Sequence, residues 1–382
     1  MNKTLFSILS TLLLGLFLGC TGEMSTEVTL EEIKNAEELP YSDIDDITDE
    51  PQDTTPVGPV SQYGQLQAAN PSGWGFIYGA CSGIESGKEV QVRGMSLYWS
   101  IMNDALAFYT RNAITTMVKD MKIEVIRLAI ATDDSWGNVG GYIYAPDYQL
   151  SIVDTVINAA VENDIYVIID WHSHHAEEQI LYAEQFFNEV ASRYGHLDNV
   201  IFELYNEPKG DYGYSNAMQY WPTIQNYASY IISIIRLYSD NLVIVGTPFY
   251  SQYPNVAVSS PIFDTNVAYS FHYYANSHSI RQEGENALNA IQNGFAVFVT
   301  EWGTGNADGG GTPNLQRNDD WQAFMNNYKL SWANWSASRI KEGTAAFSSG
   351  STDTTLFYST SGELVKSYLE SNPVQYTRCK AK

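Results

Sequence analysis

The sequence predicts an α/β fold in which eight parallel strands close into a single (β/α)8 (TIM) barrel. Apolar segments rich in Val, Ile, Phe and Tyr alternate with helical patterns, several are apolar throughout, and polar residues gather at their carboxyl ends. Continuously apolar strands are typical of parallel sheets that are buried on both faces. A doubly wound open sheet is the alternative, but it would normally have a glycine-rich phosphate turn after its first strand. Arg93-Gly94-Met95-Ser96 is not such a turn.

The strands are assigned from their Val, Ile, Phe and Tyr content, and the helices from apolar residues that recur at helical spacing. We expect strands at residues 89–96, 124–131, 165–172, 200–207, 242–248, 267–274, 296–302 and 331–337. We expect helices at residues 148–164, 176–195, 217–239, 279–293, 314–329 and 363–371. The connection at 249–266 contains two prolines and would hold only a short helix. Eight strands with intervening helices are typical of a barrel.

The first residues resemble an export signal. Lys3 precedes a short apolar stretch at 5–18, which is too short to span a membrane comfortably, and Gly19-Cys20 follows. A small residue followed by Cys at this place resembles a bacterial lipoprotein cleavage site. We therefore expect residues 1–19 to be removed and Cys20 to be lipidated, which would anchor the protein to the outer membrane or cell surface of a bacterium without spanning it. An ordinary secretory signal with an incidental Cys is the alternative.

Residues 20–73 are expected to form a disordered linker. Between Thr21 and Asp53 there are twelve acidic residues and one lysine, and several prolines follow. Such a segment buries too little apolar surface to offset the entropy lost on ordering, and like charges keep it extended. The remaining residues, 74–382, are sufficient for one large catalytic domain.

The domain at 74–382 is acidic, with 32 acidic and 18 basic residues and a net charge of −14. This charge argues against binding to nucleic acid and fits a protein that acts on a neutral ligand. Cys81 and Cys379 lie near opposite ends of the domain. Export would permit a disulfide between them, and two separate thiols are the alternative.

Two glutamates stand at the carboxyl ends of buried strands. Glu207 lies in Leu204-Tyr205-Asn206-Glu207-Pro208, and Glu301 lies in Phe298-Val299-Thr300-Glu301-Trp302-Gly303. A carboxylate costs too much free energy to bury at the end of a strand without a role. In a barrel these strand ends meet at one face, which holds the active site. Paired carboxylates in two different environments are what the hydrolysis of a glycosidic bond requires.

Other polar residues are expected at the same face of the barrel. They are Arg127, Trp171-His172, Asn206-Glu207-Pro208, His272-Tyr273-Tyr274, Glu301-Trp302-Gly303 and Asn334-Trp335-Ser336. In identity and order this set resembles glycoside hydrolase family 5. The stretches Val92-Arg93-Gly94-Met95-Ser96 and Val299-Thr300-Glu301-Trp302-Gly303-Thr304 most resemble its bacterial endo-β-1,4-glucanases. The resemblance implies a retaining mechanism, a β-glucan substrate, no cofactor and no metal, and we expect a monomer.

The resemblance also implies a role for each matching residue. Glu207 corresponds to the acid/base and Glu301 to the nucleophile. Two negative charges about 5 Å apart cannot easily both be ionised, so one pKa rises, and we expect Glu207 to be the protonated partner. Supporting roles fall to Arg127 and Tyr274 beside Glu301, His272 beside Glu207, Asn206 on the sugar 2-hydroxyl, His172 on another hydroxyl in the −1 subsite, and Trp335 stacked beneath that sugar.

The chain departs from the glucanase pattern in two places. Leu97-Tyr98-Trp99-Ser100 stands where these enzymes usually have Ser-His-Gly and a later Trp. Tyr98 therefore replaces a sugar-binding His, and Trp99 is a candidate for the stacking Trp. Lys341-Glu342 resembles a Lys and Glu that bind a hydroxyl in the −2 subsite, with the Lys displaced by one position.

Three other functions fit part of this pattern. Another family 5 specificity, for mannan, mixed-linkage glucan or xyloglucan, would share the same catalytic residues. A metal-dependent amidohydrolase could use His172-Ser173-His174 but needs further ligands at later strands, and Gly246-Thr247-Pro248 supplies none. A non-catalytic surface glycan-binding protein would be expected to have lost one of the two glutamates. The leading prediction is an exported, retaining endo-β-1,4-glucanase that cleaves internal bonds by double displacement.

Overall fold

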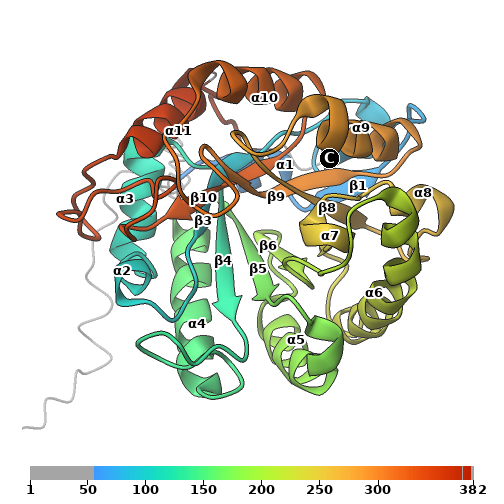
Figure 1. Cartoon of the computed structure of the whole chain (residues 1–382), viewed down its shortest axis with the longest axis horizontal. Coiled ribbons are helices and arrows are strands. Elements are labelled where there is room, and N and C mark those ends of the chain that lie inside the picture. Colours follow the sequence, from blue (N-terminus) through green and yellow to red (C-terminus); the bar gives the residue numbers. More distant parts are fainter. Residues whose placement is uncertain (1–55, 372, 380–382) are drawn as a thin grey trace, which may run out of the picture. The chain divides into compact units, whose positions relative to one another are not determined.

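The computed structural model describes residues 56–371 and 373–379, and eight of its strands form a closed parallel barrel (Figure 1). Each barrel strand pairs with the next along the chain, and the last pairs with the first. The strands are β3 (Arg93–Leu97), β4 (Val125–Ala131), β5 (Tyr166–His172), β6 (Val200–Glu203), β7 (Val243–Val245), β8 (Val267–Tyr274), β9 (Val297–Gly303) and β10 (Trp332–Ala337). The predicted (β/α)8 barrel is therefore confirmed.

Helices lie around the outside of the barrel strands (Figure 1). They are α2 (Asn103–Leu106), α3 (Arg111–Met121), α4 (Pro146–Glu162), α5 (Ile180–Tyr194), α6 (Tyr214–Ile235), α7 (Pro248–Ser251), α8 (Val256–Ser259), α9 (Glu285–Gln292), α10 (Leu315–Asn327) and α11 (Thr360–Ser371). The described chain also contains the short helical turns η1 (Ile84–Ser86), η2 (Ala176–Gln179) and η3 (Ile280–Gly284). The connection at 249–266, which was expected to hold a short helix, contains part of α7 and all of α8.

The sequence pattern did not identify α3. Its buried residues Ala113, Ile114, Met117 and Met121 recur at helical spacing, but polar residues between them dilute the apolar signal. The side chain of Thr110 caps this helix by accepting a hydrogen bond from the Ala113 N–H at 3.1 Å. A start signal was therefore present in the sequence.

Residues 59–73 belong to the folded domain, which corrects the predicted end of the linker at residue 73. Pro59–Tyr63 form α1, and β1 (Leu66–Ala69) pairs antiparallel with β2 (Phe76–Gly79). Leu66 is 1% exposed and packs with Ile77 against residues at the amino-terminal end of the barrel. Composition alone missed this contact because the surface that buries Leu66 comes from distant strands.

The predicted signal at 1–19, the lipidation site at Cys20 and linker residues 20–55 lie outside the described part of the chain. Among the helices of the described ranges, none has the length and apolar character needed to cross a membrane.

Cys81 and Cys379 form a disulfide, which decides between the two alternatives that the sequence left open. Their Cα atoms lie 6.0 Å apart although 298 positions separate them in the sequence. The tail that carries Cys379 also contacts the residue before β4, where Tyr376 Oη donates to Glu124 Oε1 at 2.5 Å. The disulfide therefore lies at the amino-terminal end of the barrel, opposite the predicted catalytic face.

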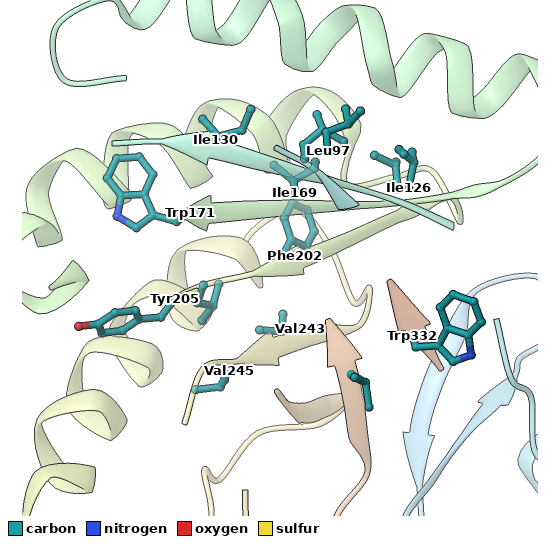
Figure 2. Close-up of a cluster of buried hydrophobic side chains, with 14 of the residues drawn as sticks. Leu97, Ile126, Ile130, Ile169, Trp171, Phe202, Tyr205, Val243, Val245 and Trp332 are labelled. Atoms are coloured by element: carbon teal, nitrogen blue, oxygen red, sulfur yellow. The ribbon is translucent and has the colours of Figure 1, made fainter. Parts of the chain in front are cut away.

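The barrel interior changes from apolar to polar toward the carboxyl ends of the strands. Side chains alternate across a strand, so Ile126 and Ile130 of β4 pack outward, as Figure 2 shows, in the core between strands and helices. The inward positions Val125, Ile168, Ile201, Ile244 and Phe298 form an apolar layer. Two residues further along β4, β6 and β9 stand Arg127, Glu203 and Thr300, which begin a buried polar layer.

Candidate active site

Arg127 is the centre of a buried network of charges. Its guanidinium donates to Glu203 Oε2 at 2.7 Å, Asn206 Oδ1 at 2.7 Å and Glu301 Oε2 at 3.1 Å. It also forms an ion pair with Asp170 Oδ2 at 2.9 Å. Burial alone would lower the pKa of Arg127, but Asp170, Glu203 and Glu301 raise it, so the side chain stays charged. This fixed cation orients both Glu301 and Asn206, as the resemblance implied for Glu301.

Glu301 receives a hydrogen bond on each carboxylate oxygen. Tyr274 Oη donates to Oε1 at 2.7 Å, and Arg127 donates to Oε2. Gly303 makes the first contact possible, because a Cβ at this position would lie 2.2 Å from the Tyr274 ring. Burial raises the pKa of Glu301, and the charge of Glu207 adds to the increase. Arg127 and Tyr274 oppose that increase and hold the carboxylate in one orientation.

Glu207 has a histidine at each carboxylate oxygen. His272 Nδ1 lies 3.0 Å from Oε1, and His174 Nε2 lies 3.2 Å from Oε2. Burial would raise the pKa of Glu207, but hydrogen bonds from His174 and His272 lower it to about 2. The pKa of Glu207 is therefore lowered in the free protein, where a raised value was expected, because the two imidazoles outweigh the effect of burial.

The carboxylates around His272 favour its protonated form instead. Burial would lower the pKa of His272, but Glu203 and Glu207 raise it to about 9. Thr300 Oγ1 donates to Glu203 Oε1 at 2.6 Å, so this hydroxyl accepts from His272 Nε2 at 2.9 Å. Because Nε2 keeps its hydrogen in that contact, Nδ1 is the atom that exchanges a proton with Glu207.

The predicted sugar-binding residues meet at a cleft of about 210 Å³ beside the two glutamates. The predicted residues that line it are Trp99, His172, Asn206, Glu207, Tyr274, Glu301, Trp335 and Glu342. The Trp335 and His172 rings are parallel within 4°, with centroids 5.4 Å apart. Trp99 makes an edge-to-face contact with the other rings of this group through His172, with ring centroids 4.3 Å apart. Trp335 therefore presents a fixed aromatic surface to the cleft.

Tyr98 and Glu342 line the cleft and come from the two stretches in which the chain departs from the glucanase pattern. Tyr98 lines the cleft, donates to Glu342 Oε1 at 3.0 Å and packs on Trp335 with ring centroids 5.0 Å apart. Glu342 is thereby fixed where a sugar hydroxyl can reach it. Lys341 is exposed and is not among the described residues that line this cleft, so its role in sugar binding stays a prediction.

Sequence reasoning assigned no role to four residues that shape the site. Asp170, Glu203 and Thr300 are polar residues within apolar strands, the same signal that identified Glu207 and Glu301. Asp170 and Glu203 even stand at paired positions of neighbouring strands. His174 follows His172 by two residues, and its contact with Glu207 depends on the path of the loop after β5.

A carboxylate oxygen of Glu207 and one of Glu301 lie within 4.8 Å of each other. Retaining glycosidases have carboxyl groups about 5–5.5 Å apart, whereas inverting enzymes leave about 6.5–9.5 Å. With His272, the two glutamates are also spaced to hold a divalent cation, although an ion there would occupy the space that an anomeric carbon must enter. The barrel and this pair of carboxylates define the class of the protein as a glycoside hydrolase of the retaining geometry.

The chain belongs to the cellulase family, glycosyl hydrolase family 5, whose family model matches residues 84–340. It is 42% identical to endoglucanase Z of Dickeya dadantii over 286 residues, which are 73% of this chain and 62% of that protein. The chain thus spans less than two thirds of the length of this relative.

Solved structures of the same family share the fold. A glycoside hydrolase family 5 cellulase from an Icelandic hot spring isolate has a TM-score of 0.75 and 33% identity, over 85% of this chain and 100% of that one. The catalytic domain of Thermobifida fusca endoglucanase Cel5A in complex with cellotetraose has a TM-score of 0.69 and 28% identity, over 82% and 99%. The family resemblance seen in the sequence is confirmed.

Proposed function

We propose that the protein is a retaining, endo-acting glycoside hydrolase that cleaves internal β-1,4-glucosidic bonds of cellulose or related β-glucans. The separation of Glu207 and Glu301, within 4.8 Å, carries this proposal, because it suits double displacement. Two of the similar proteins are endoglucanases by name, and one of them was solved with cellotetraose. These names support a β-1,4-glucan as the substrate.

In the first step Glu301 attacks the anomeric carbon, and Glu207 protonates the leaving glycosidic oxygen. Arg127 and Tyr274 hold the attacking carboxylate in line by hydrogen bonds at 3.1 and 2.7 Å. Trp335 stacks beneath the sugar and His172 binds one of its hydroxyls. Asn206 binds the 2-hydroxyl, a contact that strengthens in the transition state.

The proton for the leaving group comes from the His272–Glu207 pair. In the free protein this proton lies on His272 Nδ1, 3.0 Å from Glu207 Oε1. A sugar in the cleft excludes water and reduces the solvation that favours two separated charges. The proton then moves to Glu207, which delivers it to the glycosidic oxygen and later removes a proton from the attacking water.

A side-by-side assay on soluble cellulose derivatives, mixed-linkage glucan, xyloglucan and mannan tests the substrate. We expect the fastest turnover on β-1,4-glucan, with a rapid fall in viscosity because internal bonds are cut. Faster turnover of mannan or another glycan would show that the protein has a different substrate specificity within family 5. Binding without turnover would overturn the proposal in favour of a glycan-binding protein.

Glu301→Ala tests the mechanism. This variant should fold and lose nearly all turnover, because the covalent intermediate cannot form. Azide should enter the space left by the carboxylate, restore part of the activity and give a product of the opposite anomeric configuration. A Glu301→Ala variant that keeps its activity without azide would show that the nucleophile is misassigned.

We further propose that the protein is exported and held at a bacterial membrane surface by lipid on Cys20. The short apolar stretch at 5–18 and the Gly19-Cys20 pair support this proposal. The linker that follows would then hold the catalytic domain away from the surface. The disulfide between Cys81 and Cys379 is compatible with an oxidising, exported location. A monomeric state and the lack of nucleic-acid binding stay predictions.

A further inference from the structure

A groove of about 580 Å³ lies between η3 and α10, outside the cleft that holds the two glutamates. Its size falls within the roughly 300–1,000 Å³ of ligand pockets. The buried rings of Trp321 and Phe324 belong to its lining, together with the partly buried ring of Tyr328. We call it the α10 groove.

The rim of the α10 groove carries polar groups of mixed charge. Arg281, Asp320 and Asn327 are exposed lining residues, and the half-buried Arg317 donates to the carbonyls of Asn276 and His278. Such a rim does not select a charged ligand, but its donors and acceptors suit the hydroxyl groups of a neutral sugar. Trp74 extends the aromatic surface, since it stacks on Tyr328 with centroids 6.4 Å apart and is 38% exposed.

His278 connects the α10 groove to the catalytic centre. It lines the groove and also a second pocket of about 330 Å³, which contains Glu207, Tyr250 and His272. The position of His278 is fixed, because its Nδ1 accepts from the Tyr274 N–H at 2.8 Å and its carbonyl accepts from Arg317 at 3.0 Å.

The second pocket lies beside Glu207, which the proposed function places next to the leaving group. It shares Glu207 and Tyr274 with the catalytic cleft but does not include Trp335 or Glu342, which lie on the side of the attacked sugar. A chain that leaves the acid/base Glu207 through this pocket reaches His278 and then the α10 groove. His278 belongs to the lining of both, so the groove borders the pocket that contains Glu207.

We propose that the α10 groove binds distal sugar units of the substrate chain on the leaving-group side of the cleavage site. The proposal rests on the proposed glucanase function, because its occupant is a distant part of the same neutral polysaccharide. The partly exposed rings of Tyr328 and Trp74 pack against the apolar faces of the sugars, and the rim residues bond to their hydroxyls. The groove therefore raises the efficiency on long chains and leaves short substrates unaffected.

The first test fills the groove. Ala323 is an exposed lining residue on α10, so Ala323→Trp places a bulky ring in the groove without disturbing the core. We expect kcat/KM on soluble hydroxyethyl cellulose to fall severalfold, whereas kcat/KM on an aryl cellobioside stays at the wild-type value. Ser192→Trp, at an exposed position on α5, is the matched control and should change neither value.

A second variant and a binding assay keep the proposal falsifiable. Asp320→Ala removes a rim group without adding bulk, and it should show the same selective loss to a smaller degree. In a native gel that contains hydroxyethyl cellulose, Ala323→Trp in a Glu301→Ala background should migrate faster than Glu301→Ala alone. Wild-type turnover of the polymer by both groove variants, with unchanged migration, would overturn the groove proposal. Lack of wild-type activity on every glucan would instead overturn the proposed function.

Discussion

His272 Nδ1 lies 3.0 Å from Oε1 of Glu207, so the two side chains are within hydrogen-bond distance. The other imidazole nitrogen donates to Thr300 Oγ1, which itself donates to Glu203, so the ring cannot turn without breaking two hydrogen bonds. With a pKa of about 9 for His272 and about 2 for Glu207, the proton lies on the imidazole before substrate binds. The acid for catalysis is therefore the pair and not Glu207 alone.

The pH dependence of kcat/KM should report this pair and Glu301. We expect a bell-shaped profile, because the pair must keep its proton while Glu301 must lose its own. The alkaline limb should lie near pH 9, where His272 loses its proton. The acidic limb should lie above pH 4.5, the ordinary value for Glu, because burial raises the pKa of Glu301. Initial rates on a soluble glucan over this range provide the measurement, and an alkaline limb near pH 6.5 would contradict the shared proton.

The second histidine on Glu207 gives a separate prediction. His174 donates to Oε2 of Glu207 at 3.2 Å, and a hydrogen bond to a charged group contributes about 1.5–3 kcal/mol. Because this contact also fixes the direction of the Glu207 carboxyl group, His174→Phe should lower kcat on glucan by roughly 10–100-fold, part of what a positioned general acid contributes. His174→Gln, which keeps a donor, should recover part of the loss.

A comparison of two substrates shows whether His174 positions Glu207 or only supports the fold of the site. An aryl glycoside with a good leaving group needs no protonation in the first step, so His174→Phe should slow that step little. Glu207→Ala should show the same selectivity to a greater degree and should accumulate the covalent intermediate. Equal losses on both substrates in His174→Phe would assign His174 a structural role only.

The barrel was predictable because its signals are local. Continuously apolar segments and the polar residues that end them are visible within a few residues of Glu207 and Glu301. The antiparallel pair β1–β2 was missed for the opposite reason. Leu66 is buried in a cluster that includes residues of β6, β7, β8 and β9, more than a hundred positions away in the sequence, and no local pattern records such a contact.

The residues of the site were easier to predict than their protonation. Strand position placed Arg127, His272 and Tyr274 beside the glutamates, and the structure brings all three into contact with them. The protonation of His272 could not be predicted from strand position, because it depends on which oxygen of Glu207 each imidazole contacts. The burial that raises one pKa and the hydrogen bonds that lower another are properties of the folded site.

Loss of the disulfide should change stability and leave catalysis intact. Cys81 and Cys379 join both ends of the described domain at the amino-terminal side of the barrel, away from Glu207 and Glu301. Closing so long a loop typically stabilises the native state by about 2–5 kcal/mol. Cys81→Ser should therefore unfold at a temperature several degrees lower, as should the wild-type protein after reduction. Calorimetry measures the unfolding temperature, and a glucanase assay at 25 °C measures turnover. Reduced turnover in the folded variant would contradict the prediction that the disulfide does not affect catalysis.

The predicted lipid anchor has the simplest genetic test. Cys20→Ser removes the proposed site of lipid attachment but leaves the apolar stretch at 5–18 and the catalytic domain unchanged. A single lipidated terminus is the only membrane contact that we propose, so glucanase activity should move from the membrane fraction to the soluble fraction. The kcat/KM of the released enzyme should equal that of the wild type, because the residues of the site all lie between Tyr98 and Glu342. Membrane association that survives Cys20→Ser would overturn the lipoprotein proposal and indicate an uncleaved leader or a protein partner at the surface.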